Sequence, residues 1–348
     1  MAKVMAKTVK LADIAAIVNV STVTVSKALS DQKGVSEEMR ARIKQLAKEM
    51  GYQTPTAARL SSNKRTYNIG VLISEIYFDQ TQSFYWQMYQ SVATRATAKE
   101  CFTMLEVIGK AEEESSRMPK LVQERKVDGI IVIGKMMDAY LQHLNTEAGI
   151  PVIYLDYYNG REASDSVISN SYYGTYELTY YLYRMGHRKI AYVGTLLAME
   201  SITDRYFGYQ KALLELGLEQ KKGWVLDDRH IETGEIDTVN MLQIPKDMPT
   251  AFVCNCDQTA SFLIKKLKDN GYRVPEDISV VGFDNYLYPG LSDIQITTYE
   301  VDLEEMARRA IHNMISKISN ENYKPGIHIV EGHMVLKESV AQIPSGKA

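Results

Sequence analysis

The chain has 348 residues, of which 45% are hydrophobic and 24% charged, and its formal net charge is −3. This composition is typical of a globular protein and excludes a disordered or fibrous chain. No apolar run approaches the length of a membrane span, and the first ten residues lack the apolar core of a signal peptide. We therefore expect a cytoplasmic protein with no membrane partner.

The charge is distributed unevenly along the chain. Residues 1–65 contain 12 Lys/Arg against 5 Asp/Glu, a balance of +7, so the remaining residues carry −10. A basic segment on an acidic body concentrates phosphate affinity at one end of the chain. This pattern favours a separate DNA-binding domain over a protein that binds nucleic acid across its whole surface.

Residues 9–30, VKLADIAAIVNVSTVTVSKALS, predict two short helices joined by a tight turn. Asn19 can adopt the left-handed conformation of the turn, and Ser21 can cap the second helix. Apolar residues recur at helical spacing and form an inward face: Leu11, Ile14, Ala15, Val18, Val25, Ala28 and Leu29. The residues left facing outward are small or hydroxylated, which predicts a helix-turn-helix that presents its second helix to a major groove. The alternative is an ordinary helical hairpin.

The segment resembles the headpiece of the lac repressor/galactose repressor family, which begins D-V-A-x-x-A-G-V-S-x-x-T-V-S-R-x-L. The chain has DIAAIVNVSTVTVSKAL at the same place, followed by VSEEMRARI at 35–43 and EMGYQTP at 49–55. The resemblance continues through essentially the whole chain. It implies contacts with double-stranded DNA from Ser21, Thr22, Val23, Thr24, Ser26 and Lys27.

Within that set, the resemblance implies that Thr22, Val23 and Lys27 read bases. Lys27 can donate to guanine O6 and N7, Thr22 can bond several base edges, and Val23 can touch a thymine methyl. The other three side chains suit phosphate contacts or helix capping. The alternative for Lys27 is an ordinary solvated lysine.

A third helix is expected from Ser36 to about Met50, followed by a short helical segment over residues 55–62. In the family, this segment is a hinge helix that orders on operator DNA and inserts a leucine into the minor groove. The chain departs from that pattern, because the usual leucine position is Ser61 and Leu60 stands one residue earlier. Either Leu60 inserts with a shifted register, or the DNA is bent differently.

From residue 68 onward, short apolar runs alternate with helical patterns, which predicts βαβ units and parallel sheets. The expected strands cover residues 68–74, 101–107, 128–134, 151–156, 189–194, 250–255 and 277–283. The expected helices include residues 84–100, 112–125, 174–185, 206–216 and 259–270. About 280 residues of this pattern exceed one compact sheet, so we expect two similar lobes with a cleft between them.

The fold class we predict is therefore α/β, with an all-α helix-turn-helix headpiece over residues 1–53 and a hinge over 54–66. The resemblance implies that residues 67–348 form a core like a periplasmic binding protein, crossed three times by the chain. We expect lobe 1 to hold about 67–165 and 297–326, and lobe 2 about 166–296 and 327–348. The motifs GHRKIAYVG, VPEDISVVGFDN and ITTYEVDLEEMARRA match family landmarks in order.

Effector-binding residues are expected at strand ends and in adjacent loops. Arg205 stands where the family has an arginine that grips the effector, and its alternative role is an ion pair with Asp204. Asp257 follows an apolar strand; its alternative role is to cap the next helix, and both roles can hold together. The remaining candidates are Phe84 and Tyr85, which match a pair of aromatics on the lobe 1 side, with Asn170 and Asp284 at strand ends.

No pattern typical of catalysis is present. The sequence has no Walker-type loop, no G-x-S-x-G, no HExxH, and no ligand spacing among its six histidines. Cys101, Cys254 and Cys256 are too few for a disulfide framework, and the last two are spaced poorly for a metal. We expect three reduced, buried thiols, no catalytic residues, no metal and no cofactor.

The prediction is a transcriptional regulator whose homodimer binds a near-palindromic operator. A small-molecule effector, preferably a sugar or sugar phosphate, is expected to control operator affinity, with repression relieved by the effector. Three alternatives stay open: a purine-type corepressor, a phosphorylated carrier protein as the signal, and a sugar-binding protein without a DNA target. The chain ends in ESVAQIPSGKA without leucine heptads, so we expect a dimer rather than a tetramer.

Overall fold

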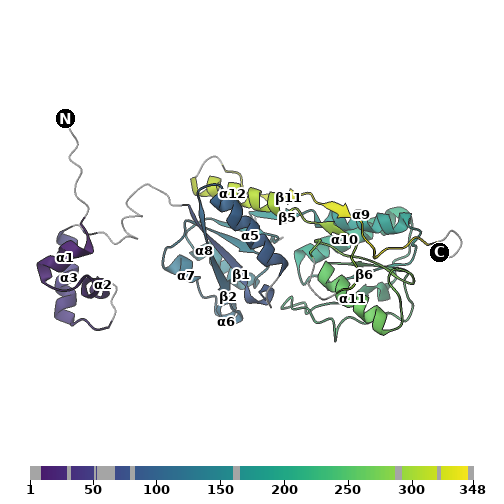
Figure 1. Ribbon diagram of the computed structural model, residues 1–348, viewed down its shortest axis with the longest axis horizontal. Helices are drawn as coiled ribbons and strands as arrows, with labels where there is room; N and C mark the ends of the chain where they lie inside the picture. The colour runs from purple at the N-terminus through teal and green to yellow at the C-terminus, as the bar shows by residue number, and fades with distance from the viewer. Residues whose placement is uncertain are drawn as a thin grey trace. The chain divides into compact units, whose positions relative to one another are not determined.

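The computed structural model describes residues 9–29, 33–50, 52, 67–78, 83–159, 165–286, 292–319 and 323–343. The chain divides into two compact units, residues 1–66 and 67–348, whose elements are labelled in Figure 1. Within the described ranges, no single helix is long and apolar enough to cross a membrane. The bent pair α1 and α2, described next, passes that test of length and composition only when taken together.

The first unit contains α1 (Leu11–Val18), α2 (Thr22–Leu29) and α3 (Glu37–Glu49). The axes of α1 and α2 meet at 104°, the geometry of a helix-turn-helix. Its core is made by residues that the helical spacing predicts to be buried, together with two from α3: Ile14, Ala15, Val18, Val25, Ala28, Ile43 and Ala47. Leu11 and Leu29 are only half-buried at the edge of this cluster.

The local signals at the helix ends are confirmed. Asn19 ends α1 in the left-handed conformation, with φ 54°. Ser21 Oγ accepts a hydrogen bond from Thr24 N at 3.1 Å, and Ser36 Oγ accepts one from Met39 N at 3.4 Å. The hinge positions Leu60 and Ser61 lie outside the described residues, so the DNA contact by one of them stays a prediction.

Lobe 1 is built on a six-stranded parallel sheet in the order β2-β1-β3-β4-β5-β11. Its strands are β1 (Asn68–Ser74), β2 (Phe102–Ile108), β3 (Gly129–Ile133), β4 (Val152–Leu155), β5 (Ser166–Ser169) and β11 (Ile327–Val330). Its helices are η1 (Glu75–Tyr77), α5 (Phe84–Thr97), α6 (Lys110–Glu114), α7 (Lys120–Gln123), α8 (Asp138–Glu147) and α12 (Leu303–Ser319). Helices α5 and α12 cover one face of the sheet, and α7 and α8 cover the other.

Lobe 2 is built on a four-stranded parallel sheet in the order β7-β6-β8-β9, with an antiparallel pair β10-β12 beside it. Its strands are β6 (Ile190–Val193), β7 (Val225–Leu226), β8 (Ala251–Cys254), β9 (Ser279–Val281), β10 (Thr298–Glu300) and β12 (His333–Val335). Its helices are α9 (Ser171–Arg184), α10 (Glu200–Leu216), η2 (Lys222–Trp224) and α11 (Asp257–Asp269). Alternate residues of β6 and β8 face α9 and α10 on one side and α11 on the other.

The strand pairing corrects the expected crossing points near 165, 297 and 326. Strands β5 and β11 pair in the sheet of lobe 1, and β10 lies with lobe 2. The chain therefore crosses near residues 170, 301 and 331, four or five positions later than expected. The crossings were predicted too early in the chain because the sheet of lobe 1 includes β5 and β11. These two short strands carry no long apolar run.

The expected helix over residues 112–125 was also wrong. The segment forms two short helices, α6 and α7, interrupted at Pro119. Proline lacks an amide hydrogen and cannot continue a helix from the preceding turn.

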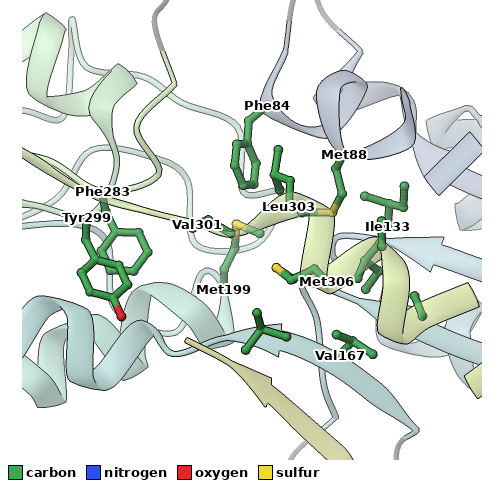
Figure 2. Packing of buried hydrophobic residues seen from close by; sticks show 14 of the residues in the cluster. Phe84, Met88, Ile133, Val167, Met199, Phe283, Tyr299, Val301, Leu303 and Met306 are labelled. Carbon is green, nitrogen blue, oxygen red and sulfur yellow. The ribbon is translucent and has the colours of Figure 1, made fainter. Parts of the chain in front are cut away.

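One apolar cluster joins the two lobes at the crossing strands. Figure 2 shows Val301 and Leu303, which enter α12, lying between Phe283 and Tyr299 on one side and Met88 on the other. All five side chains are buried. The lobes are therefore connected through this packed apolar cluster, and the polar strand ends described next lie on either side of it.

Candidate effector site and DNA-binding helix

The outward face of α2 has the character that DNA contact requires. Thr22, Ser26 and Lys27 are exposed, and Val23 is 61% exposed although it is a large apolar residue. Thr24 is half-buried, and its hydroxyl lies 2.9 Å from Ser21 Oγ. Ser21 and Thr24 therefore stabilise the start of the helix, while the other four side chains face solvent.

In lobe 1, a hydrogen-bonded pair lies at the carboxyl ends of the strands. Tyr85 OH donates to Asp156 Oδ2 at 3.1 Å, and the Tyr85 ring lies 4.6 Å from that of Tyr77. The two rings approach β3 closely because Gly134 has no side chain, since a Cβ there would lie 3.0 Å from Tyr77 Cε2. Burial raises the pKa of Asp156, and the positive charge of Arg205 lowers it in part.

In lobe 2, Arg205 on α10 is almost completely buried and held by three partners. Its Nε donates to Ser171 Oγ at 3.2 Å, its Nη1 donates to the Asn255 carbonyl at 2.7 Å, and its guanidinium lies 3.9 Å from the centre of the Phe283 ring. Helices α9 and α10 approach closely enough for the first of these contacts because Gly208 has no Cβ to clash with the α9 backbone.

Asp204 does not form the ion pair considered for Arg205. Its carboxylate instead accepts a hydrogen bond from Tyr158 OH, at 3.0 Å to each oxygen. Tyr158 follows β4 and Asp204 lies on α10, so this bond links the two lobes.

Two carboxylates lie side by side at the end of β9. Asp257 is 3% exposed, and its Oδ1 has no hydrogen-bond partner among the residues that the structure describes. Asp284 Oδ1 accepts from Tyr286 N at 3.0 Å. Burial and the neighbouring negative charge raise the pKa of Asp257 well above its usual range, and burial raises that of Asp284 to about 7.

Asp257 does not cap α11. The capping group is the Cys256 thiol, which accepts from Thr259 N at 3.5 Å. Among the three cysteines, which are all free, Cys101 and Cys254 are buried, but Cys256 is only partly buried. The expectation that every thiol is buried was therefore wrong for Cys256, because its side chain turns to the helix end rather than into the core.

The structure thus brings Tyr85, Arg205 and Asp284 close enough to interact electrostatically around Asp156. Phe84 lies in the apolar cluster shown in Figure 2. The centre of its ring is 6.4 Å from that of Tyr286. Asn170 occupies a different position. Its Oδ1 accepts from Tyr173 N at the start of α9, and its Nδ2 donates to Glu331, so it joins two crossing segments.

Sequence reasoning missed Asp156 and a buried network at the ends of β7 and β8. Arg229 Nη2 donates to Asp228 Oδ2 at 2.8 Å, and the same carboxylate accepts from Asn255 Nδ2 and Thr259 Oγ1. These bonds lower the pKa of Asp228 to about 2 despite its burial. Asp156 directly follows an apolar run and Asp228 stands two residues after one, so both positions could have been predicted as strand ends. No group of three or more metal-ligating side chains was found among the described residues.

Two family profiles match separate parts of the chain. The profile described as "Bacterial regulatory proteins, lacI family" matches residues 10–55, and that of a "Periplasmic binding protein-like domain" matches residues 179–340. The first covers the helix-turn-helix. The second covers most of lobe 2, the crossings near residues 301 and 331, and α12 and β11 of lobe 1. The chain belongs to the lacI family. It is accordingly a DNA-binding transcriptional regulator.

Curated relatives in the lacI family align over nearly their whole length. The "HTH-type transcriptional repressor PurR" of Aliivibrio salmonicida (strain LFI1238) is 26% identical over 335 residues, which are 95% of this chain and 98% of the relative. The protein of the same name from Glaesserella parasuis serovar 5 (strain SH0165) is 27% identical over 321 residues, or 90% and 91% of the two chains. These relatives are repressors and not enzymes, as the sequence predicts for this chain.

Solved structures share the fold of the whole chain. A "transcriptional regulator CelR-cellobiose complex" superposes with a TM-score of 0.65 at 24% identity, covering 95% of this chain and 99% of the other. A lac repressor dimer bound to operator and the anti-inducer ONPF superposes with a TM-score of 0.66 at 20% identity, covering 96% and 100%. The predicted architecture of helical headpiece and α/β core with parallel sheets is therefore confirmed.

Proposed function

We propose that this lacI-family protein is a dimeric repressor that leaves its operator when a sugar binds between the two lobes. The observation that carries the effector assignment is the convergence of Tyr85, Asp156, Arg205 and Asp284 from both lobes. A ligand that contacts both sides binds the closed arrangement of the lobes more tightly than an open one. Such differential affinity is what shifts a conformational equilibrium.

The chemistry of this group favours an uncharged sugar over a sugar phosphate. Carboxylates accept hydrogen bonds from adjacent hydroxyls, and the guanidinium of Arg205 can donate two in parallel. A phosphate dianion would instead lie near Asp156, Asp257 and Asp284, where burial raises the pKa of each carboxyl and thus already disfavours negative charge. A purine is the second candidate, because the neighbouring rings of Tyr77 and Tyr85 offer an aromatic surface to a flat base.

On DNA, we propose that Thr22, Val23 and Lys27 contact base edges while Ser21, Thr24 and Ser26 position the helix. The exposure of Val23 supports this assignment, since an apolar residue gains little from facing water.

A palindromic operator requires two headpieces related by a two-fold axis, and we therefore propose a homodimer. The dimer interface, called the seam below, would include α5 and the segment 250–290. The neighbouring edge strand β2 supports it, because Phe102 is 68% exposed there. We place the protein in the cytoplasm because its target is genomic DNA.

Thermal unfolding with a panel of sugars and nucleobases tests the effector assignment. A ligand present at 100 times its dissociation constant adds about 2.7 kcal/mol of stability, enough to raise the Tm by several degrees. We expect at least one sugar to do so in the wild type and not in an Asp156→Asn variant. Stabilisation by purines and by no sugar would contradict the sugar assignment while leaving the DNA-binding function intact.

A further inference from the structure

The first residue of the core, Tyr67, is held in place by the last residue of α12, Ser319. Tyr67 OH and Ser319 Oγ lie 3.2 Å apart and share a hydrogen bond, and the Tyr67 ring packs against the apolar cluster that joins the lobes. The backbone of Tyr67 has φ 50°, a left-handed conformation that residues other than glycine rarely adopt. Such a conformation persists only where the surrounding contacts hold it, and it is frequent in switch regions.

The residue after Tyr67 is fixed as well. Asn68 N donates to Asp128 Oδ2 at 3.0 Å, its side-chain Nδ2 donates to the Lys126 carbonyl at 3.3 Å, and its own carbonyl accepts from Asp128 N at 2.7 Å. Helix α12 lies against the same place, because Gly129 has no Cβ to clash with Met314. The start of the core is therefore attached rigidly both to β3 and to the end of α12.

The other end of α12 lies at a crossing between the lobes. Only Asp302 separates Val301, in the apolar cluster of Figure 2, from Leu303, the first residue of the helix. Asp302 Oδ1 accepts from Glu305 N at 2.9 Å and so caps the helix. At a rise of about 1.5 Å per residue, its 17 residues span about 25 Å. No loop therefore separates the crossing from the helix that reaches Tyr67.

We infer that α12 and the contact between Tyr67 and Ser319 transmit the arrangement of the lobes to the start of the core, with Tyr67 as a positioning residue. The inference rests on the proposed control of operator binding by the core, but it does not depend on which effector binds. A displacement at the crossing tilts a rigid helix as a whole, so the far end of the helix moves with it. The chain toward the headpiece leaves the core at Tyr67, and it follows that end only while the contact with Ser319 is made.

Thermodynamic linkage supplies a test that needs no effector, because operator binding must then alter the crossing in return. Hydrogen exchange is measured by mass spectrometry on the full-length protein, free and saturated with an inverted repeat selected for it from random DNA. The readout is the exchange rate of residues 297–306, which contain the crossing. Tyr67→Phe keeps the ring and removes the hydrogen bond to Ser319. Tyr176→Phe is the matched control, since Tyr176 OH donates to Glu215 at 2.7 Å on the exposed surface of lobe 2.

The repeat should change exchange over residues 297–306 at least threefold in the wild type and in Tyr176→Phe, but less than 1.5-fold in Tyr67→Phe. Affinity for the repeat and the Tm should be alike in the two variants, which separates transmission from a merely structural role. A wild-type response in Tyr67→Phe would overturn the inference. So would a loss of response that comes with a lowered Tm or weaker DNA binding, or a wild type whose crossing the repeat leaves unchanged. Transmission to the crossing, with no sugar that changes operator affinity, would contradict the sugar-responsive function alone.

Discussion

Replacing Arg205 by alanine tests two roles of its side chain, which are stabilisation of the folded core and contact with the effector. The change removes two hydrogen bonds from a buried guanidinium and its contact with the Phe283 ring. A hydrogen bond from a charged group contributes about 1.5–3 kcal/mol, and a desolvated cation–π contact about 2 kcal/mol. We expect Arg205→Ala to lower the free energy of unfolding of the core by about 3–5 kcal/mol, and the Tm by about 10 °C.

Tryptophan fluorescence during heating reports this change cleanly. Trp86 and Trp224 are the only tryptophans in the sequence, so the signal comes from residues 67–348. Arg273→Ala serves as control, because Arg273 pairs with Asp277 on the surface and should leave the Tm close to that of the wild type. A Tm for Arg205→Ala equal to that of Arg273→Ala would refute the buried placement. Operator affinity should stay within a few fold at 20 °C, and the effector should no longer change it.

Four further outcomes are expected. Lys27→Ala should weaken specific operator binding by about 1–3 kcal/mol in fluorescence anisotropy but change binding to random DNA little, whereas the exposed Lys48→Ala should affect both alike. Because the Asp284 carboxyl has a pKa of about 7 and sugar hydroxyls donate to its ionised form, calorimetric sugar affinity should rise from pH 6 to pH 8 and become flat in Asp284→Asn. Burial lowers the pKa of His187 to about 4, so the fold is stabilised by the neutral ring. Stability should fall by up to about 3 kcal/mol from pH 6.5 to pH 4, and His187→Gln should remove that part of the pH profile in urea titrations. Phe102→Glu should convert the expected dimer to monomers in sedimentation velocity, and an unchanged dimer would exclude β2 from the seam.

The headpiece was predictable because its determinants are local. Asn19 at the turn and Ser21 as a cap act within a few residues, and helical spacing selects the buried face correctly. The long strands were equally visible as apolar runs. The short strands β10 and β12 carried no such signal, because each has only three residues and gains its place from tertiary pairing.

The candidate site was less visible in the sequence because its contacts join distant segments. Asp156 becomes notable only beside Tyr85, which stands 71 positions earlier in the chain. The capping role considered as the alternative for Asp257 belongs to Cys256, a residue type that is rarely considered as a cap. Asn170 was assigned to the effector from its position in the sequence, but its side chain is hydrogen-bonded at a crossing between the lobes.

The central claim is that sequence-specific DNA binding by the headpiece is controlled by a ligand held between the lobes. The most direct measurement is an anisotropy titration of the full-length protein with an inverted repeat selected from random DNA, with and without a sugar that raises its Tm. The account predicts tight binding to the repeat, a steep loss of affinity with salt, and at least a tenfold weakening when the sugar is present. Equal affinity for the repeat and for scrambled DNA, or an operator affinity that no stabilising ligand changes, would contradict it.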